Sequence, residues 1–291
     1  MSTASSAPEV ATAHREGRLI GEGGRQIAWQ AWLPEAGDPK AVVVIAHGAS
    51  EHGGRYRYVV ERLVPEGFAV YAIDHRGHGR SDGTRAQIDR MAHVVADLDQ
   101  LVDQVRAEHP GLKLFLLGHS MGGCIGIAYT IAHQEKLDGL ALSAPLAALD
   151  AAPLPLRLVA KALSLVLPDT GVYQVSSEAV SRDAAEVADY DADPLNHHGK
   201  LPARTVQELA DTVARFEADS PKLTLPLLVM IGTADTLVPP AGGQMVHDRA
   251  GSTDKTLKTY DGFFHEIFNE PAGERDRPLD DLAAWLTERT G

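Results

Sequence analysis

The chain has 291 residues, of which 44% are hydrophobic and 23% charged, and this composition is ordinary for a globular protein. Its net charge of -13 offers no basic surface to a nucleic-acid backbone, so we expect no nucleic-acid partner. At this length the chain can form one large α/β domain or a core domain that carries an insertion.

The first sixteen residues are rich in Ser, Ala and Thr and lack the continuous apolar stretch of a signal peptide. We interpret residues 1–16 as a disordered tail of a cytoplasmic protein. The chain has one cysteine, Cys124, so an intramolecular disulfide is excluded. No segment reaches the ~18 to 20 apolar residues that span a bilayer, so any membrane contact is expected to be peripheral.

Short apolar runs recur along both ends of the chain and alternate with amphipathic segments. Continuous apolar runs are typical of strands buried on both faces, which indicates a mostly parallel sheet covered by helices on both sides. We assign residues 17–145 and 223–291 to this α/β core. The runs are 41–46, 68–73, 112–117, 137–142 and 225–231, and helical stripes of apolar residues follow over 91–105 and 279–286.

The alternation stops between residues 146 and 222, where helical patterns dominate and no strand is evident. We predict an inserted helical cap there. Its first helix, about 153–167, is apolar on nearly every side. Such a helix either roofs an apolar pocket or contacts lipid, or it packs between the core and another cap helix.

A serine stands on a tight turn between a strand and a helix. The sequence Gly118-His119-Ser120-Met121-Gly122 follows the apolar run 112–117 and leads into a helical segment. In this layout the serine is held on a strained elbow as a nucleophile, and the glycines avoid collisions with neighbouring backbone. We therefore predict that Ser120 is a catalytic nucleophile.

A serine hydroxyl needs an imidazole to accept its proton, and in this arrangement the chain order is Ser, then acid, then His. His247 falls in a helical stretch, where an exposed position on the helix surface is the default. His265 lies in a loop after the strand-like segment 255–260, and such a loop reaches the edge of the sheet where ligands collect. We predict that His265 is the base.

The acid is expected to fix the tautomer of this histidine. Asp235 follows the buried run 227–231 and therefore emerges at the same edge of the sheet as Ser120. Asp254 and Asp261 flank the strand before the base and are weaker alternatives. We predict Asp235 as the third member of the triad.

The negative oxygen of the tetrahedral intermediate requires positioned donors. We expect one from the backbone N–H of Met121 and another from the loop 47–52, where Ala49 is our choice. No glycine-rich phosphate loop opens a helix, and the histidines of 74–83 and 197–198 lack the spacing of a metal site. We predict no cofactor and no metal.

Four motifs together resemble those of the monoacylglycerol lipases, particularly the bacterial ones, over about residues 18–286. They are His47-Gly48-Ala49-Ser50-Glu51-His52-Gly53-Gly54-Arg55-Tyr56, Asp74-His75-Arg76-Gly77-His78-Gly79-Arg80-Ser81, Gly118-His119-Ser120-Met121-Gly122-Gly123 and Phe264-His265-Glu266-Ile267-Phe268-Asn269-Glu270.

This resemblance implies an α/β-hydrolase fold with a cap, and a serine hydrolase that cleaves monoacylglycerol to glycerol and fatty acid through an acyl-enzyme. The triad it implies is Ser120, Asp235 and His265, with Ala49 and Met121 as oxyanion donors. It also implies a polar site for the glycerol, formed by Glu51, Arg55, His119 and Tyr190.

Three alternatives stay open at this point. Glu51 and Arg55 can equally form a structural ion pair that braces their loop. The same triad also serves a carboxylesterase or a lysophospholipase. A ligand-binding protein without catalysis, built on a hydrolase scaffold, is the alternative from another class.

Overall fold

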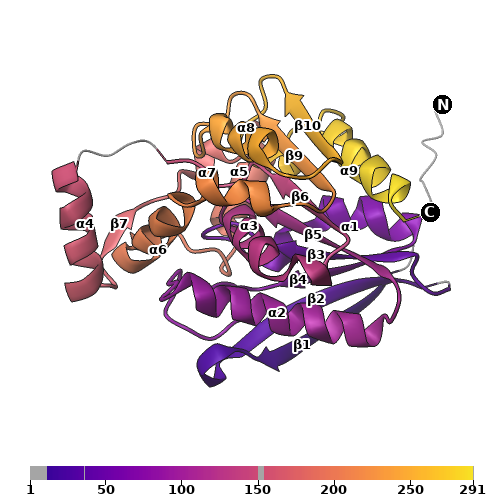
Figure 1. Cartoon of the computed structure of the whole chain (residues 1–291), viewed down its shortest axis with the longest axis horizontal. Helices are drawn as coiled ribbons and strands as arrows, with labels where there is room; N and C mark the ends of the chain where they lie inside the picture. Colours follow the sequence, from indigo (N-terminus) through magenta and orange to yellow (C-terminus); the bar gives the residue numbers. More distant parts are fainter. Residues whose placement is uncertain (1–11, 36, 150–153, 291) are drawn as a thin grey trace.

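A computed structural model describes residues 12–35, 37–149 and 154–290. Its centre is an eight-stranded sheet in the order β1-β2-β4-β3-β5-β6-β9-β10 (Figure 1). Within this sheet, the pairs β1–β2 and β2–β4 are antiparallel and the other described pairs are parallel. The strands are β1 (Thr12–Ile20), β2 (Gln26–Pro34), β3 (Ala41–Ala46), β4 (Phe68–Ile73), β5 (Lys113–His119), β6 (Gly139–Ser143), β9 (Leu227–Gly232) and β10 (Lys255–Tyr260). The predicted, mostly parallel sheet is confirmed.

Helices cover both faces of the sheet, and the central strands supply side chains to each. Along β3, Val42 and Val44 belong to one apolar cluster while Val43 and Ile45 belong to the other. This is the two-residue alternation of a strand buried on both sides. The first face is covered by α2 (Met91–Glu108), α3 (Met121–His133) and α8 (Pro240–Arg249), and the second by α1 (Arg57–Leu63) and α9 (Asp276–Glu288).

Strand β1 corrects the predicted boundary of the N-terminal tail. It begins at Thr12 and pairs with β2 residue by residue up to Ile20, so residues 12–16 are not disordered. The strand was missed because its side chains are largely polar and exposed, and backbone pairing at the sheet edge holds it in place. Residues 1–11, the rest of the predicted tail, lie outside the described residues.

The segment between β6 and β9 is inserted between two strands of the sheet, and its elements α4, β7 and α6 project at the left of Figure 1. It contains a two-stranded antiparallel sheet of β7 and β8, which the sequence analysis did not predict, because strands so short leave no hydrophobic alternation. Pro153, the predicted start of the first cap helix, lies outside the described residues. The elements are α4 (Leu154–Val166), β7 (Gly171–Tyr173), α5 (Ala184–Ala192), β8 (Leu201–Pro202), α6 (Ala203–Val213) and α7 (Phe216–Asp219).

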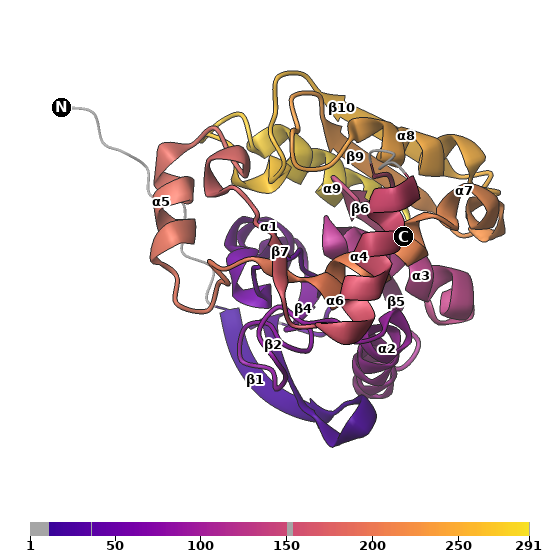
Figure 2. The ribbon, with the colours of Figure 1, turned by 90° about the vertical axis from the view of Figure 1, so that its left-hand side faces the viewer.

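Helix α4 packs against α6, and both lie at the front of the view in Figure 2. The domain limits 146 and 222 remain a prediction; the chain leaves the sheet after Ser143 and returns to it at Leu227. Within the described ranges, no helix is long and apolar enough to cross a bilayer.

Three buried histidines lie together just after the ends of β3 and β4. The rings of His47 and His75 have centroids 4.5 Å apart, and those of His47 and His78 are 5.3 Å apart. Burial lowers the pKa of His47 to about 4 and that of His78 to about 3, and it also places the pKa of His75 well below the usual value. These rings are therefore neutral at pH 7. Among the described residues no group of side chains is arranged to hold a metal ion.

The close packing of α3 onto β3 gives a stability prediction. A Cβ atom at Gly122 would lie 2.0 Å from the Ala46 carbonyl oxygen, whereas a Cβ at Gly126 in the same helix would make only ordinary contacts at 3.5 Å. Gly122→Ala should therefore lower the free energy of unfolding by about 1 to 3 kcal/mol. Gly126→Ala is the matched control and should leave it unchanged or raise it by up to ~1 kcal/mol. Urea denaturation measures both, and equal stability of the two variants would contradict the packing argument.

The buried histidines predict how stability depends on pH. An unfolded histidine titrates near pH 6.5, so between about pH 6.5 and 4 the unfolded chain binds protons that folded His47 and His78 do not. The free energy of unfolding should be highest above pH 6.5 and fall as the pH decreases, by roughly 1.4 kcal/mol per pH unit for each histidine. Urea denaturation at a series of pH values tests this, and a constant value between pH 7 and 5 would count against it.

Candidate active site

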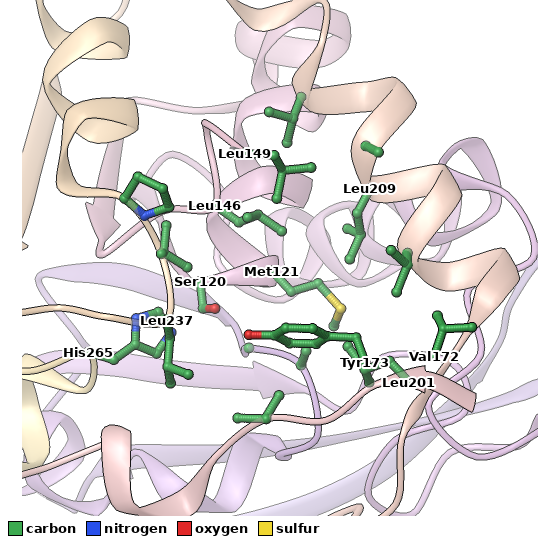
Figure 3. Close-up of a pocket in the computed structure, with 18 of the residues that line it drawn as sticks. Ser120, Met121, Leu146, Leu149, Val172, Tyr173, Leu201, Leu209, Leu237 and His265 are labelled. Atoms are coloured by element: carbon green, nitrogen blue, oxygen red, sulfur yellow. The ribbon is translucent and has the colours of Figure 1, made fainter. Parts of the chain in front are cut away.

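Ser120 occupies the turn between β5 and α3 and has φ 52° and ψ -118°. A positive φ is rare for a residue with a side chain and costs of order 1 to 3 kcal/mol, so the surrounding packing must impose it. A Cβ at Gly118 would lie 2.5 Å from the Gly122 carbonyl oxygen, which explains the glycine there. The turn holds the serine side chain at the edge of a cavity (Figure 3).

His265 and Asp235 form a buried pair next to this turn. The Nδ1 atom of His265 lies 2.7 Å from Asp235 Oδ2, while Asp235 Oδ1 accepts hydrogen bonds from the amides of Leu237 and Val238. Burial alone would raise the pKa of Asp235, but the hydrogen bond and charge of His265, together with these amides, lower it below its usual value. The carboxylate is therefore charged and holds a proton on Nδ1, which leaves Nε2 free to accept one.

The His265 ring and the Ser120 side chain lie beside each other in Figure 3 and line the same cavity. No hydrogen bond joins Ser120 Oγ to His265 among the described residues, and such contacts commonly tighten only when substrate binds. The alternatives lie elsewhere: His247 pairs with Asp248 on α8, Asp254 pairs with Arg289, and Asp261 accepts a hydrogen bond from Thr233.

The loop after β3 runs beside Ser120, since a Cβ atom at Gly48 would lie 3.2 Å from the Ser120 Cβ, and Ala49, Ser120 and Met121 all line the cavity. Neither the Ala49 amide nor the Met121 amide donates a hydrogen bond to another group within the described ranges. The Met121 amide is at the first turn of α3, where backbone N–H groups have no partner within the helix. The two amides are available to a ligand oxygen.

The buried carboxylate of Glu51 fixes the conformation of the loop that follows β3. Its Oε1 atom accepts hydrogen bonds from the Gly48 amide at 2.5 Å and from the Tyr56 hydroxyl at 2.8 Å. Its Oε2 atom accepts one from Arg55 Nε at 3.3 Å. The ion pair that the sequence analysis kept as an alternative is present, and it engages both carboxylate oxygens.

Arg55 joins this loop to the one that carries His265. Its Nη2 atom donates to Glu266 Oε2 at 2.7 Å, and all three charged side chains of the Glu51–Arg55–Glu266 cluster are buried or nearly so. Burial alone would lower the pKa of Arg55, but the two carboxylates raise it well above its usual value. Glu266 was missed as a site residue, although its position directly after His265 was the available signal.

The remaining candidates for the glycerol site lie around this cluster. The Arg55 guanidinium lies 4.7 Å from the centre of the Tyr190 ring, and the Tyr190 hydroxyl donates to the Ser50 carbonyl at 3.4 Å. His119 has its Nδ1 atom 3.0 Å from the Ser143 carbonyl oxygen, and its ring lies 4.7 Å from that of His265. The structure thus brings Glu51, His119 and Tyr190 to the wall of the cavity that contains Ser120, with Arg55 directly behind them.

The cavity has a volume of about 790 Å³ and extends away from Ser120 under the inserted segment. Its size and its apolar wall suit a long hydrocarbon chain. Tyr173, which the sequence analysis did not single out, also lines it. The apolar wall includes Leu146, Leu149, Leu163, Leu201, Leu209 and Val213.

Comparisons with known proteins show which family the chain resembles. Residues 37–272 match the family described as serine aminopeptidase, S33. The chain is 42% identical to a monoacylglycerol lipase of Mycolicibacterium smegmatis, over 95% of this chain and 98% of the relative. It is 36% identical to human monoglyceride lipase, over 94% of this chain and 90% of that protein.

Among solved structures, a monoacylglycerol lipase of Paleococcus ferrophilus superposes with a TM-score of 0.79 at 27% identity, covering 96% of this chain and 99% of that one. The predicted α/β-hydrolase fold is confirmed by the sheet and by this similarity. The sequence identities and the shared fold show that the chain belongs to the monoacylglycerol lipase family of the α/β-hydrolases.

Proposed function

We propose that the protein is a serine hydrolase that cleaves monoacylglycerol to glycerol and a free fatty acid through an acyl-enzyme. The observation that carries this is the strained Ser120 turn beside the buried His265–Asp235 pair, at the edge of a large apolar cavity. The identity to monoacylglycerol lipases along almost the whole chain supports the same substrate.

In the proposed reaction, Ser120 Oγ attacks the ester carbonyl while His265 Nε2 accepts its proton. Asp235 keeps the ring oriented and stabilises its positive charge. The amides of Ala49 and Met121 donate hydrogen bonds to the resulting oxyanion, each worth ~3 to 4 kcal/mol of barrier. The bond to glycerol then breaks as His265 returns the proton to the departing oxygen, and water releases the acyl group by the same steps.

The paired charges near the proposed glycerol site favour a substrate with a neutral headgroup. We propose that Glu51, Arg55, His119 and Tyr190 surround the glycerol. Arg55 is paired with both Glu51 and Glu266, and no Lys or Arg is among the described residues that line the cavity, so no lysine or arginine is available there for a phosphate. Neither of these two carboxylates is free to hold a peptide amino terminus. A diol needs hydrogen bonds but no counter-charge, so a glycerol ester suits this end better than a lysophospholipid or a peptide.

The inserted segment suggests how a lipid substrate arrives. Ala160 and Leu163 of α4 line the cavity, while Val159, Leu165 and Val166 on the same helix are 62%, 66% and 75% exposed. The helix lies at the outer edge of the molecule in Figure 1. We propose that the exposed side of α4 contacts a lipid surface peripherally, since its other side borders the cavity for the acyl chain.

Removal of the nucleophile tests the reaction. Ser120→Ala should lower kcat for monooleoylglycerol by ~10⁶-fold, because the other triad members cannot act without it. Fatty-acid release measures the rate, and an unchanged melting temperature shows that the variant is folded. Appreciable hydrolysis by Ser120→Ala would contradict the proposal. A much higher kcat/KM for p-nitrophenyl acetate or lysophosphatidylcholine than for long-chain monoacylglycerol would contradict the substrate class.

Replacement of exposed apolar side chains tests the membrane contact. The double variant Leu165→Ser, Val166→Ser should bind phosphatidylcholine vesicles at least several-fold more weakly in co-sedimentation, because burial of each side chain contributes about 1.5 to 3 kcal/mol. Hydrolysis of a water-soluble ester should stay unchanged. Ile20→Ser is the matched control, since Ile20 is 61% exposed but lies on β1 of the core. Equal vesicle binding by wild type and the double variant would refute this contact.

A further inference from the structure

Tyr173 of the inserted segment points from the cavity wall toward Ser120. It ends β7 and pairs with Leu201 of β8, so the small two-stranded sheet fixes its backbone. Its side chain lines the cavity and is still 45% exposed. In Figure 3 the ring lies alongside the Met121 side chain and the hydroxyl points toward Ser120.

The Tyr173 hydroxyl has no hydrogen-bond partner within the described ranges, and the apolar side chains of Val172 and Leu201 line the same cavity at the backbone end of the tyrosine. Because Tyr173 is 45% exposed, water can solvate this hydroxyl in the free enzyme. A substrate that fills the cavity displaces that water, and the hydroxyl then needs an acceptor on the substrate itself. Burial and the charge of Asp235 raise the pKa of Tyr173 above its usual value. The hydroxyl therefore stays protonated at neutral pH and acts as a donor.

The ester carbonyl is the ligand group that must lie beside Ser120. Its carbon bonds to Oγ, so its oxygen is held close by, and this oxygen becomes negative in the tetrahedral intermediate. A charged acceptor strengthens a hydrogen bond roughly twofold over a neutral one. In the function proposed above, the glycerol hydroxyls lie away from this carbonyl oxygen, near the Glu51–Arg55–Glu266 cluster.

We propose that Tyr173 donates a third hydrogen bond to the reacting carbonyl oxygen, in addition to the amides of Ala49 and Met121. This inference rests on the proposed hydrolase function. Those two amides belong to the core, whereas the phenol belongs to the inserted segment. Full stabilisation of the oxyanion therefore requires the inserted segment to be seated on the core as it is in the structure.

Tyr173→Phe removes the hydroxyl and keeps the ring. It should lower kcat for monooleoylglycerol by about 10- to 100-fold with KM within twofold, because the lost bond matters mainly in the transition state. A p-nitrophenyl ester with the same acyl chain should lose rate by the same factor, since it carries no glycerol. The affinity for a long-chain trifluoromethyl ketone, whose tetrahedral adduct with Ser120 mimics the oxyanion, should fall in parallel with kcat/KM.

Tyr58→Phe is the matched control, because its hydroxyl bonds to Glu186, a residue outside the cavity wall, and its loss should leave all three measurements unchanged. Unchanged ketone affinity in Tyr173→Phe would overturn the inference. A rise in kcat would show instead that the phenol obstructs the site, and a loss confined to glycerol esters would show a contact with the leaving group. A wild-type protein that hydrolyses no ester and binds no ketone would refute the hydrolase function itself.

Discussion

The close approach of three backbone segments at Ser120 is the constraint on which the site depends. The end of β3, the end of β5 and the start of α3 meet so tightly that side chains at Gly118 and Gly122 would collide with main-chain atoms. This packing forces Ser120 to a positive φ and lifts its side chain off the sheet. It also sets the first amides of α3 beside the loop that follows β3. One steric arrangement thus places both the nucleophile and the proposed oxyanion donors.

Buried charges then tie the neighbouring loops to this turn. Glu51 accepts a hydrogen bond from the Gly48 amide, and Arg55 connects Glu51 to Glu266, the residue after His265. Breaking one partner of such a buried pair leaves an uncompensated charge, which is costly. The cluster therefore couples the position of the proposed oxyanion loop to that of the proposed base, and its internal pairing keeps the glycerol end polar with little free charge.

The inserted segment contributes much of the cavity wall, an exposed apolar helix surface and a tyrosine directed at Ser120. Its side chains form much of the apolar wall of the cavity, its helix α4 borders that cavity on one side and is exposed on the other, and Tyr173 extends from it toward Ser120. In the proposed mechanism, the core supplies the triad and two oxyanion donors. The inserted segment supplies the third donor and the contact with the lipid surface. Substrate entry and stabilisation of the oxyanion then depend on the same piece of chain.

The sequence by itself determined the parallel sheet, the Ser120 turn and the candidates Asp235 and His265, because short-range patterns predict each of them. These patterns are continuous apolar runs, the spacing of glycines and the order of residues after strand ends. Only the tertiary structure revealed the pairing of β1 with β2, the β7–β8 sheet, the link from Arg55 to Glu266 and the direction of Tyr173. These features arise from contacts between segments far apart in the chain. Polar edge strands and strands of two or three residues also show no hydrophobic periodicity by which the sequence could predict them.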